Sequence, residues 1–280
     1  MNKDTMNEVL AHLNQLPALP MVVQEVIRSF DDPKITTSKL AHKISQDQII
    51  TAKVLRIANS SFYGLSRQVG SVQDAVVILG FDSVRTLTIA AGLIHGFSLG
   101  TDTILDRKKF WHTSIQVAVY AKAIAKRLGQ NQEIAFTAGL LHDIGQIVLA
   151  LCIPDVYGHL LIQQSELHGD LFEIEQAELG FDHALLGSEV AKRWKFPLAI
   201  QHAIEFHHMP DQTIPSPITD IVYLANLVNE LIEDGSSDEE ILLLVPIGVQ
   251  IRLDWTPEKI KAMLSELRQL AACTGSILES

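Results

Sequence analysis

AGLLHDIGQI, residues 138–147, gives the clearest indication of how this chain folds. It lies in an apolar run that predicts one buried helix from about Asn131 to just before Pro154, and the adjacent polar residues His142 and Asp143 interrupt that run. Burying an imidazole and a carboxylate without partners costs several kcal/mol. A divalent metal ion satisfies both groups at once, because neutral imidazole and carboxylate are common metal ligands. The stretch therefore predicts a helical core that carries a metal site.

The composition indicates a globular protein with a surplus of acidic side chains. The 280 residues can form one large domain or two modest ones, and the hydrophobic share of 47% with only 6% aromatic residues suits packed aliphatic helices. The net charge of −11 argues against general binding to nucleic acid or to an anionic membrane, although it allows a local basic patch. We therefore expect neither a nucleic acid nor a membrane as a direct partner.

The cysteines and the N-terminus indicate a cytoplasmic protein. Cys152 and Cys273 lie far apart, which excludes a disulfide framework and a zinc ribbon and fits a reducing compartment. Residues 1–5 lack the basic start and apolar core of a signal peptide. Pro246 interrupts the apolar residues 241–251, so this stretch falls short of the roughly 20 apolar residues that a membrane span needs.

Helical periodicity runs through the whole chain and predicts an all-α fold. Breaks at the polar joint 100–109 and the acidic segment 234–240 divide it into an N-terminal helical half (1–100), a helical bundle (101–233) and a C-terminal helical extension (234–280). The predicted helices cover approximately 4–15, 21–30, 37–45, 47–59, 72–79, 82–98, 110–128, 131–153, 155–168, 171–179, 183–194, 197–208, 218–233 and 257–272.

Histidines near helix ends are the candidate metal ligands that accompany His142 and Asp143. They are His112, His183, His207 and His208. Taken singly, each also fits a surface histidine that the helix dipole stabilises. Taken together, they suggest a site of the kind that helix bundles build from side chains on facing helices, here for Fe, Mn, Mg or Zn.

Two further groups of residues allow a functional and a structural interpretation. Arg56, Asn59, Ser60 and Arg85 can bind a phosphate or a partner, or they can form a solvated face with a capping asparagine. The tryptophans at helical positions, Trp111 and Trp194, fit core anchors better than stacking platforms. The sequence contains no phosphate-binding glycine loop and no nucleophile elbow.

Over residues 14–230 or so, the chain resembles the HDOD proteins, a family of bacterial signalling modules related to the HD metal-dependent phosphohydrolases. The matching segments, in the order of the family, are 16–20, 44–47, 54–60, 71–76, 79–80, 110–111, 138–145, 180–183, 193–197 and 207–208. The combination of Leu-Arg-Ile-Ala-Asn-Ser at 55–60 with the His-Asp pair is specific to this family. The resemblance implies an N-terminal helical subdomain packed on an HD-like helical bundle.

The resemblance also implies which ligands this chain lacks. HD phosphohydrolases commonly have a histidine two residues after the tryptophan, where this chain has Thr113; His112 lies one residue earlier, about 100° around the helix. In these enzymes an aspartate nearer the C-terminus completes the metal ligands, and this chain has Asn226 at the matching position. His142 and Asp143 remain, and three further histidines resemble the extra ligands of binuclear relatives: His183, His207 and His208.

Two functions follow from the resemblance. The first is a non-catalytic regulatory module that binds a protein partner or a small signalling ligand. The alternative is a metal-dependent phosphohydrolase of nucleotides or cyclic dinucleotides, with Asp143 as the candidate catalytic residue and the histidines holding the metal.

Overall fold

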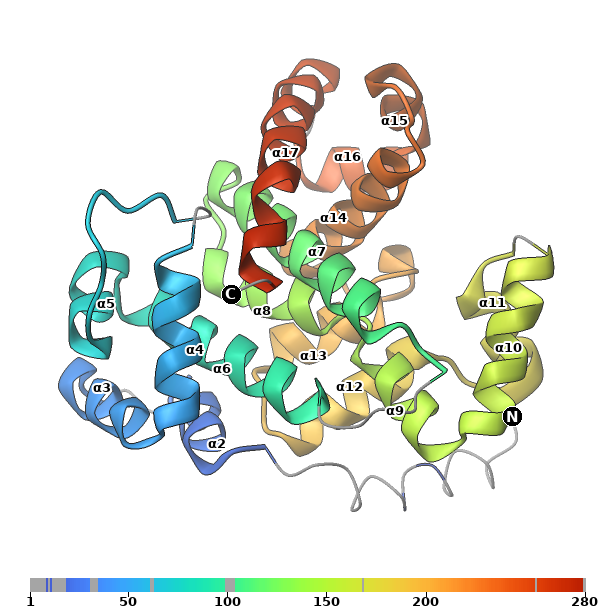
Figure 1. The fold of residues 1–280 in the computed structure, drawn as a ribbon. Helices are drawn as coiled ribbons and strands as arrows, with labels where there is room; N and C mark the ends of the chain where they lie inside the picture. Colours follow the sequence, from blue (N-terminus) through green and yellow to red (C-terminus); the bar gives the residue numbers. More distant parts are fainter. Residues whose placement is uncertain are drawn as a thin grey trace.

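The computed structural model describes residues 19–30, 35–60, 63–98, 104–167, 169–254 and 256–278, together with Val9 and Ala11. Throughout these residues the regular structure is helical, without a β-strand, as the sequence predicted. The helix expected over residues 4–15 falls almost entirely outside the described residues. Figure 1 shows the helices arranged as an N-terminal group on one side of a larger bundle.

The N-terminal group consists of α2 to α6, with bounds α2 (Met21–Arg28), α3 (Thr37–Gln46), α4 (Gln48–Ala58), α5 (Val72–Leu79) and α6 (Phe81–Ser98). Local signals set its helix ends. The Asp47 carboxylate accepts hydrogen bonds from the backbone N–H groups of residues 49 and 50 and so begins α4. Ser71 caps α5, and Gly80, with a φ of 88°, ends it. These are the ends that the sequence predicted for α5.

The central bundle follows, from α7 to α14. Its helices are α7 (Arg107–Arg127), α8 (Gln132–Leu141), α9 (Ile144–Cys152), α10 (Pro154–Leu167), α11 (Leu171–Leu179), α12 (His183–Arg193), α13 (Leu198–Glu205) and α14 (Pro217–Glu233), with the 3₁₀ turn η2 (Pro210–Gln212) before α14. α7 lies directly against α8: a Cβ atom on Gly139 would be only 2.9 Å from the Cα of Ala118. The small side chain of Ala118 on α7 therefore permits a close approach of the two helices.

The C-terminal helices α15 (Asp238–Leu244), α16 (Ile247–Arg252) and α17 (Pro257–Leu278) complete the fold, and α17 packs back on α7. One continuous cluster of buried side chains runs from α2 through the bundle to α17. The N-terminal group thus packs on the bundle through a shared core, mainly where α6 meets α8. This confirms the predicted architecture.

The structure corrects the helix that was expected over residues 131–153. α8 ends at Leu141 and α9 begins at Ile144, with His142 and Asp143 in a turn between them. The imidazole Nδ1 of His142 lies 2.7 Å from the carbonyl oxygen of Gly139, so the side chain satisfies a carbonyl at the end of α8. The polar pair therefore ends one helix and starts another instead of interrupting a single helix.

Two other predicted helix ends differ from the structure. α13 ends at Glu205, so His207 and His208 lie in the segment after the helix and not in its last turn. α17 continues beyond the predicted end at residue 272 to Leu278. The stretch 132–152 is long and apolar enough to cross a membrane, but 78% of its most apolar window is buried inside the protein, as in the core of a helical bundle.

Candidate metal centre

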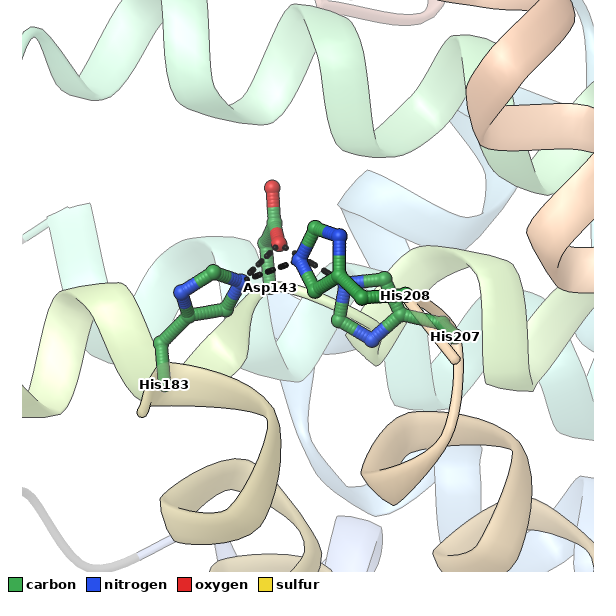
Figure 2. Close-up of side chains that lie close together, drawn as sticks. All are labelled: Asp143, His183, His207 and His208. Carbon is green, nitrogen blue, oxygen red and sulfur yellow. Dashed lines mark hydrogen bonds and ion pairs between the residues drawn. The ribbon is translucent and has the colours of Figure 1, made fainter. Parts of the chain in front are cut away.

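Four side chains from three distant parts of the sequence meet at the turn between α8 and α9 (Figure 2). Asp143, His183, His207 and His208 each offer one ligand atom, and these atoms all lie within 4.8 Å of one another. The Asp143 Oδ1 atom is 3.1 Å from the Nε2 atom of His183 and 3.4 Å from that of His207. The Nε2 atoms of His183 and His208 are 3.0 Å apart. Three separate chain segments thus build one cluster.

Hydrogen bonds at the other ring nitrogen orient these imidazoles. The Nδ1 atoms of His142 and His207 lie 2.7 Å from the carbonyl oxygens of Gly139 and Ile204. A carbonyl oxygen only accepts, so Nδ1 carries the proton and donates in both residues. Their Nε2 atoms are then unprotonated; both are buried and have no hydrogen-bond partner among the described residues. The His142 Nε2 atom lies 3.3 Å from Asp143 Oδ2, beside the four-residue cluster.

The spacing of these atoms fits a divalent metal ion. Ligands that bind an ion at about 2.1 Å lie about 3.0–3.4 Å from their nearest neighbours in octahedral and tetrahedral sites. Three of the separations in the cluster run from 3.0 to 3.4 Å, and all lie within 4.8 Å. Imidazole nitrogens grouped around a carboxylate are a donor set for Fe²⁺, Mn²⁺ or Zn²⁺. Asp143, His183, His207 and His208 would hold such an ion, with His142 next to them.

The charges of the cluster are strongly coupled. Burial lowers the pKa of His142 to about 4, and burial with the neighbouring histidines lowers that of His208, so both rings are neutral at pH 7. Burial opposes the ionised form of Asp143, but the neighbouring imidazoles of His142, His183 and His207 outweigh it and hold the pKa of Asp143 well below the usual value. His183 behaves oppositely: Glu175 and Asp143 overcome its burial and raise its pKa well above the usual value.

Glu175 on α11 is a functional residue that the sequence analysis did not single out. Its side chain is fully buried, and its Oε2 atom accepts hydrogen bonds from both the backbone N–H and the Nδ1–H of His183, each at 2.7 Å. The bond to Nδ1 directs the Nε2 atom of His183 toward Asp143. The sequence of α11 contains several acidic residues and does not distinguish Glu175 from the others. Its pairing with His183 depends on how α11 packs on α12.

Replacing Glu175 by glutamine is expected to weaken divalent metal binding by about 10–100-fold, the usual effect of losing a charged partner behind a histidine ligand. The amide oxygen can still accept from His183 Nδ1, so the ring stays in place while its basicity falls. Titration with Mn²⁺ or Zn²⁺ followed by calorimetry measures the change. Glu178→Gln, at an exposed position of the same helix, is the matched control and should bind as the unmodified protein does. Equal affinities for both variants would contradict the role of Glu175.

A cavity of about 380 Å³ opens beside the cluster, and it shows where the other predicted residues lie. Asp143, His183 and His208 line it on one side, and Thr113 of α7 and Asn226 of α14 also line it. His112 is not among its lining residues, as the shift around α7 predicts. The structure thus brings together Thr113, Asn226 and the His/Asp cluster, and leaves His112 out.

The charged residues on the rest of the cavity wall are mainly acidic. Asp106, Asp170, Glu230 and Glu233 line it, with Lys109 as the only lysine or arginine among the described lining residues. The Asn226 amide Nδ2 donates a hydrogen bond of 2.8 Å to Glu230 Oε1. Crowding by protein atoms and the charge of Asp143 raise the pKa of Glu230 to about 7. The cavity is therefore a poor receptor for a multiply charged anion unless a cation is bound there too.

The weaker candidates of the sequence analysis mostly have structural roles. The Asn59 side chain donates to the Val69 carbonyl (2.9 Å) and accepts from its N–H (2.7 Å), which ties the end of α4 to the following loop. Arg85 pairs with Asp82 (2.7 Å) and stacks over the Phe30 ring. Arg56 is exposed at the surface of α4, and the hydroxyl of Ser60 donates to the carbonyl of residue 57.

The predicted tryptophan anchors also have structural roles. Trp111 is buried, and Trp194 is half-buried with its ring 5.9 Å from that of Phe97. Both side chains therefore pack in or against the core, as the sequence indicated. Cys152 is a free thiol, in line with the absence of a disulfide framework.

Comparison with curated proteins gives relatives much longer than this chain. An uncharacterised protein of Treponema pallidum is 25% identical over 235 residues, which are 82% of this chain and 45% of that protein. Ribonuclease Y of Chloroflexus aurantiacus is 25% identical over 187 residues, which are 67% of this chain and 28% of the enzyme. The chain thus spans less than half the length of these relatives.

Solved structures match almost the whole chain. An HDOD domain protein of unknown function from Geobacter sulfurreducens has a TM-score of 0.82 and 25% identity, and the match covers 98% of each chain. A proposed phosphohydrolase from Shewanella amazonensis has a TM-score of 0.80 and 27% identity, over 97% of this chain and 98% of the other. The HDOD domain profile itself matches residues 16–210. With its helical order and its His/Asp cluster, the chain belongs to the HDOD family.

Proposed function

We propose that this chain is a regulatory module of bacterial signal transduction that binds a divalent cation and acts through a protein partner or a small signalling ligand, without hydrolysing it. The observation that carries this proposal is the pair Thr113 and Asn226 on the wall of the metal cavity. They occupy the two places where the resemblance to HD phosphohydrolases calls for a histidine and an aspartate.

Both replacements weaken a catalytic site for the same chemical reason. A threonine hydroxyl and a carboxamide are neutral and much poorer ligands for a divalent ion than imidazole and carboxylate. The Asn226 amide is moreover engaged with Glu230. The acidic cavity wall repels phosphate esters. These features support a site that retains an ion but neither centres a phosphodiester nor orients a water against it.

The retained residues keep a binding role in this proposal. Asp143, His183, His207 and His208 hold the ion, Glu175 orients His183, and the ion when bound supplies Lewis-acid character and fixes the α8–α9 turn to α12. The cavity beside them, with its apolar residues Phe110, Leu161, Leu171 and Phe172, is large enough for a small ligand.

The test restores the missing ligands. Four proteins are purified without chelator: the unmodified protein, Asp143→Ala, Thr113→His with Asn226→Asp, and that double variant with Asp143→Ala. Each is assayed for metal content and, with Mn²⁺, Fe²⁺ or Mg²⁺, for hydrolysis of nucleotides, cyclic dinucleotides and single-stranded RNA. We expect no turnover by the unmodified protein and tighter metal binding by the double variant. Turnover by the unmodified protein at an enzyme-like rate, lost on Asp143→Ala, would overturn the proposal.

The alternative, a metal-dependent phosphohydrolase, is favoured by the intact cluster of four ligand atoms. Ribonuclease Y relatives and a proposed phosphohydrolase among the solved structures fit this alternative as well. In it, Glu230 would have to replace the aspartate that completes the metal ligands of the enzymes, from one helical turn further along α14, ionising when the cation binds. Glu230→Gln would then abolish turnover, whereas in the regulatory module there is no turnover to abolish.

A further inference from the structure

Residues 241–253 carry two rows of apolar side chains, and only one of these rows packs into the core. The inner row is almost completely buried and consists of Ile241, Val245, Val249 and Leu253. Its spacing of four residues continues from α15 through Pro246 into α16, so both short helices turn the same row toward the core. This inner row accounts for the attachment of α15 and α16 to the rest of the protein.

The outer row faces solvent. Its members are Leu243 (86% exposed), Leu244 (54%), Ile247 (70%) and Ile251 (72%). Single exposed apolar residues are common on protein surfaces, but four large ones within nine residues form a concentrated patch. Isoleucine is also a weaker helix former than the polar residues that usually occupy exposed helix positions. Neither core packing nor helix formation explains the outer row, so it indicates a docking surface.

Acidic side chains outnumber basic ones in the segment that carries this surface. Residues 230–261 contain eight Asp and Glu side chains and three Lys and Arg side chains. All three basic groups are already engaged in ion pairs: Arg252 with Asp211 and Asp220, Lys259 with Asp254, and Lys261 with Glu239. Glu239 and Glu240 lie one helical turn before Leu243 and Leu244, so acid and apolar groups share a face of α15.

The surface is held in place by a strong anchor. The Arg252 guanidinium donates hydrogen bonds of 2.8 and 2.6 Å to the two carboxylate oxygens of Asp220, which is buried in α14. α14 also carries Asn226 and Glu230 of the metal cavity. Because α16 is fixed to a core helix, its outer row is preorganised. Binding a partner therefore costs little ordering entropy in α16 itself.

We propose that the outer row of α15 and α16 binds an amphipathic helix of another protein, with an apolar face flanked by lysine and arginine. This proposal rests on the regulatory function proposed above, and it specifies the chemical character of the protein partner. The charge of the surface selects this occupant. Glu239 and Glu240 form an acidic rim beside the outer row. A second copy of this chain would place its own acidic rim against this one, and the rim would also repel an anionic membrane. A basic helix is attracted by the rim and buries the apolar row.

The experiment uses two synthetic helical peptides of about 18 residues, or about five helical turns. They share a leucine face and differ in a lysine or a glutamate polar face. Fluorescence anisotropy with the whole chain measures their binding. We expect the lysine peptide to bind about tenfold or more tighter than the glutamate peptide, and Ile247→Ser with Ile251→Ser to weaken it by about tenfold or more.

Two further variants make the test specific. Val156→Ser with Ile162→Ser removes exposed apolar side chains from α10, on another part of the molecule (Figure 1), and should leave binding unchanged. Glu239→Lys with Glu240→Lys should shift the preference toward the glutamate peptide. All the replaced side chains are exposed, and circular dichroism confirms that each variant is folded.

Several results would overturn the inference. These are equal binding of the two peptides, unchanged binding by the Ile247→Ser/Ile251→Ser variant, a concentration-dependent dimer in sedimentation that this variant abolishes, and tight binding to phosphatidylserine vesicles. Metal content and hydrolysis are measured on the same samples. If the unmodified protein binds neither peptide and shows no turnover, only the docking surface is contradicted. If it hydrolyses a substrate and still binds the lysine peptide, only the proposed non-catalytic function is contradicted.

Discussion

Gly145→Ala is expected to lower the free energy of unfolding by about 3 kcal/mol or more and the melting temperature by about 6–12 °C. A Cβ atom on Gly145 would overlap the carbonyl oxygen of His183 and lie 2.8 Å from its carbonyl carbon. It would also lie 3.0 Å from the backbone nitrogen of Gly187. These are backbone atoms of α12, which cannot rotate away as a side chain can. The helices α9 and α12 would have to separate, and Asp143 would move away from His183.

Thermal unfolding followed by circular dichroism measures this change, with metal affinity as a second readout. Gly158→Ala is the matched control: its Cβ atom would meet only side-chain atoms of Ile104, at 3.5 Å and beyond. Because alanine is the better helix former, that variant should be as stable as the unmodified protein or up to about 1 kcal/mol more stable. A Gly145→Ala protein that melts at the unmodified temperature and binds metal normally would show that α9 and α12 do not need this close contact.

Asp143→Asn is expected to weaken divalent metal binding by more than about 100-fold, which exceeds the usual effect of changing a residue behind the ligands. The Asp143 Oδ1 atom lies 3.1 and 3.4 Å from two histidine Nε2 atoms, and it is the only carboxylate of the four-residue cluster. The amide retains the size of the side chain but loses its charge. It also loses the part of the attraction on His183 that Asp143 adds to that of Glu175, which together raise the pKa of His183.

Calorimetric titration with Mn²⁺ and Zn²⁺, together with elemental analysis of the purified protein, measures the effect. Asp170→Asn is the matched control, because Asp170 lines the same cavity but lies outside the cluster. It should bind metal within a few-fold of the unmodified protein. If Asp143→Asn and Asp170→Asn behave alike, the cluster is a hydrogen-bonded part of the core and not a metal centre.

The sequence predicted the elements whose ends depend on neighbouring residues. Ser71 and Gly80 bound α5 as expected, because a side-chain cap and a positive φ act within one helical turn. The turn at His142 was not predicted, because it depends on contacts beyond the neighbouring residues. The run on both sides is apolar and helical in pattern, and the break depends on where the His142 ring points within the packed bundle.

The candidate site divides in the same way. The four residues of the cluster and the adjacent His142 were all named from sequence; the four are Asp143, His183, His207 and His208. Their convergence could not be computed from spacing, because it depends on α9, α12 and the segment after α13 meeting in space. The same applies to Glu175, which is identified by its bonds to His183 and by nothing in the local pattern.

The sequence by itself determined the all-helical class, the membership suggested by the Leu-Arg-Ile-Ala-Asn-Ser and His-Asp blocks, and the presence of Thr113 and Asn226 in place of charged or imidazole ligands. Only the tertiary structure decided that both replacements face one cavity with Asp143, that Glu175 orients His183, and that one of two apolar rows on residues 241–253 is left in solvent. The physical reason is that helix propensity and capping are short-range, whereas metal geometry, close helix contacts and exposure depend on which surfaces the core brings together.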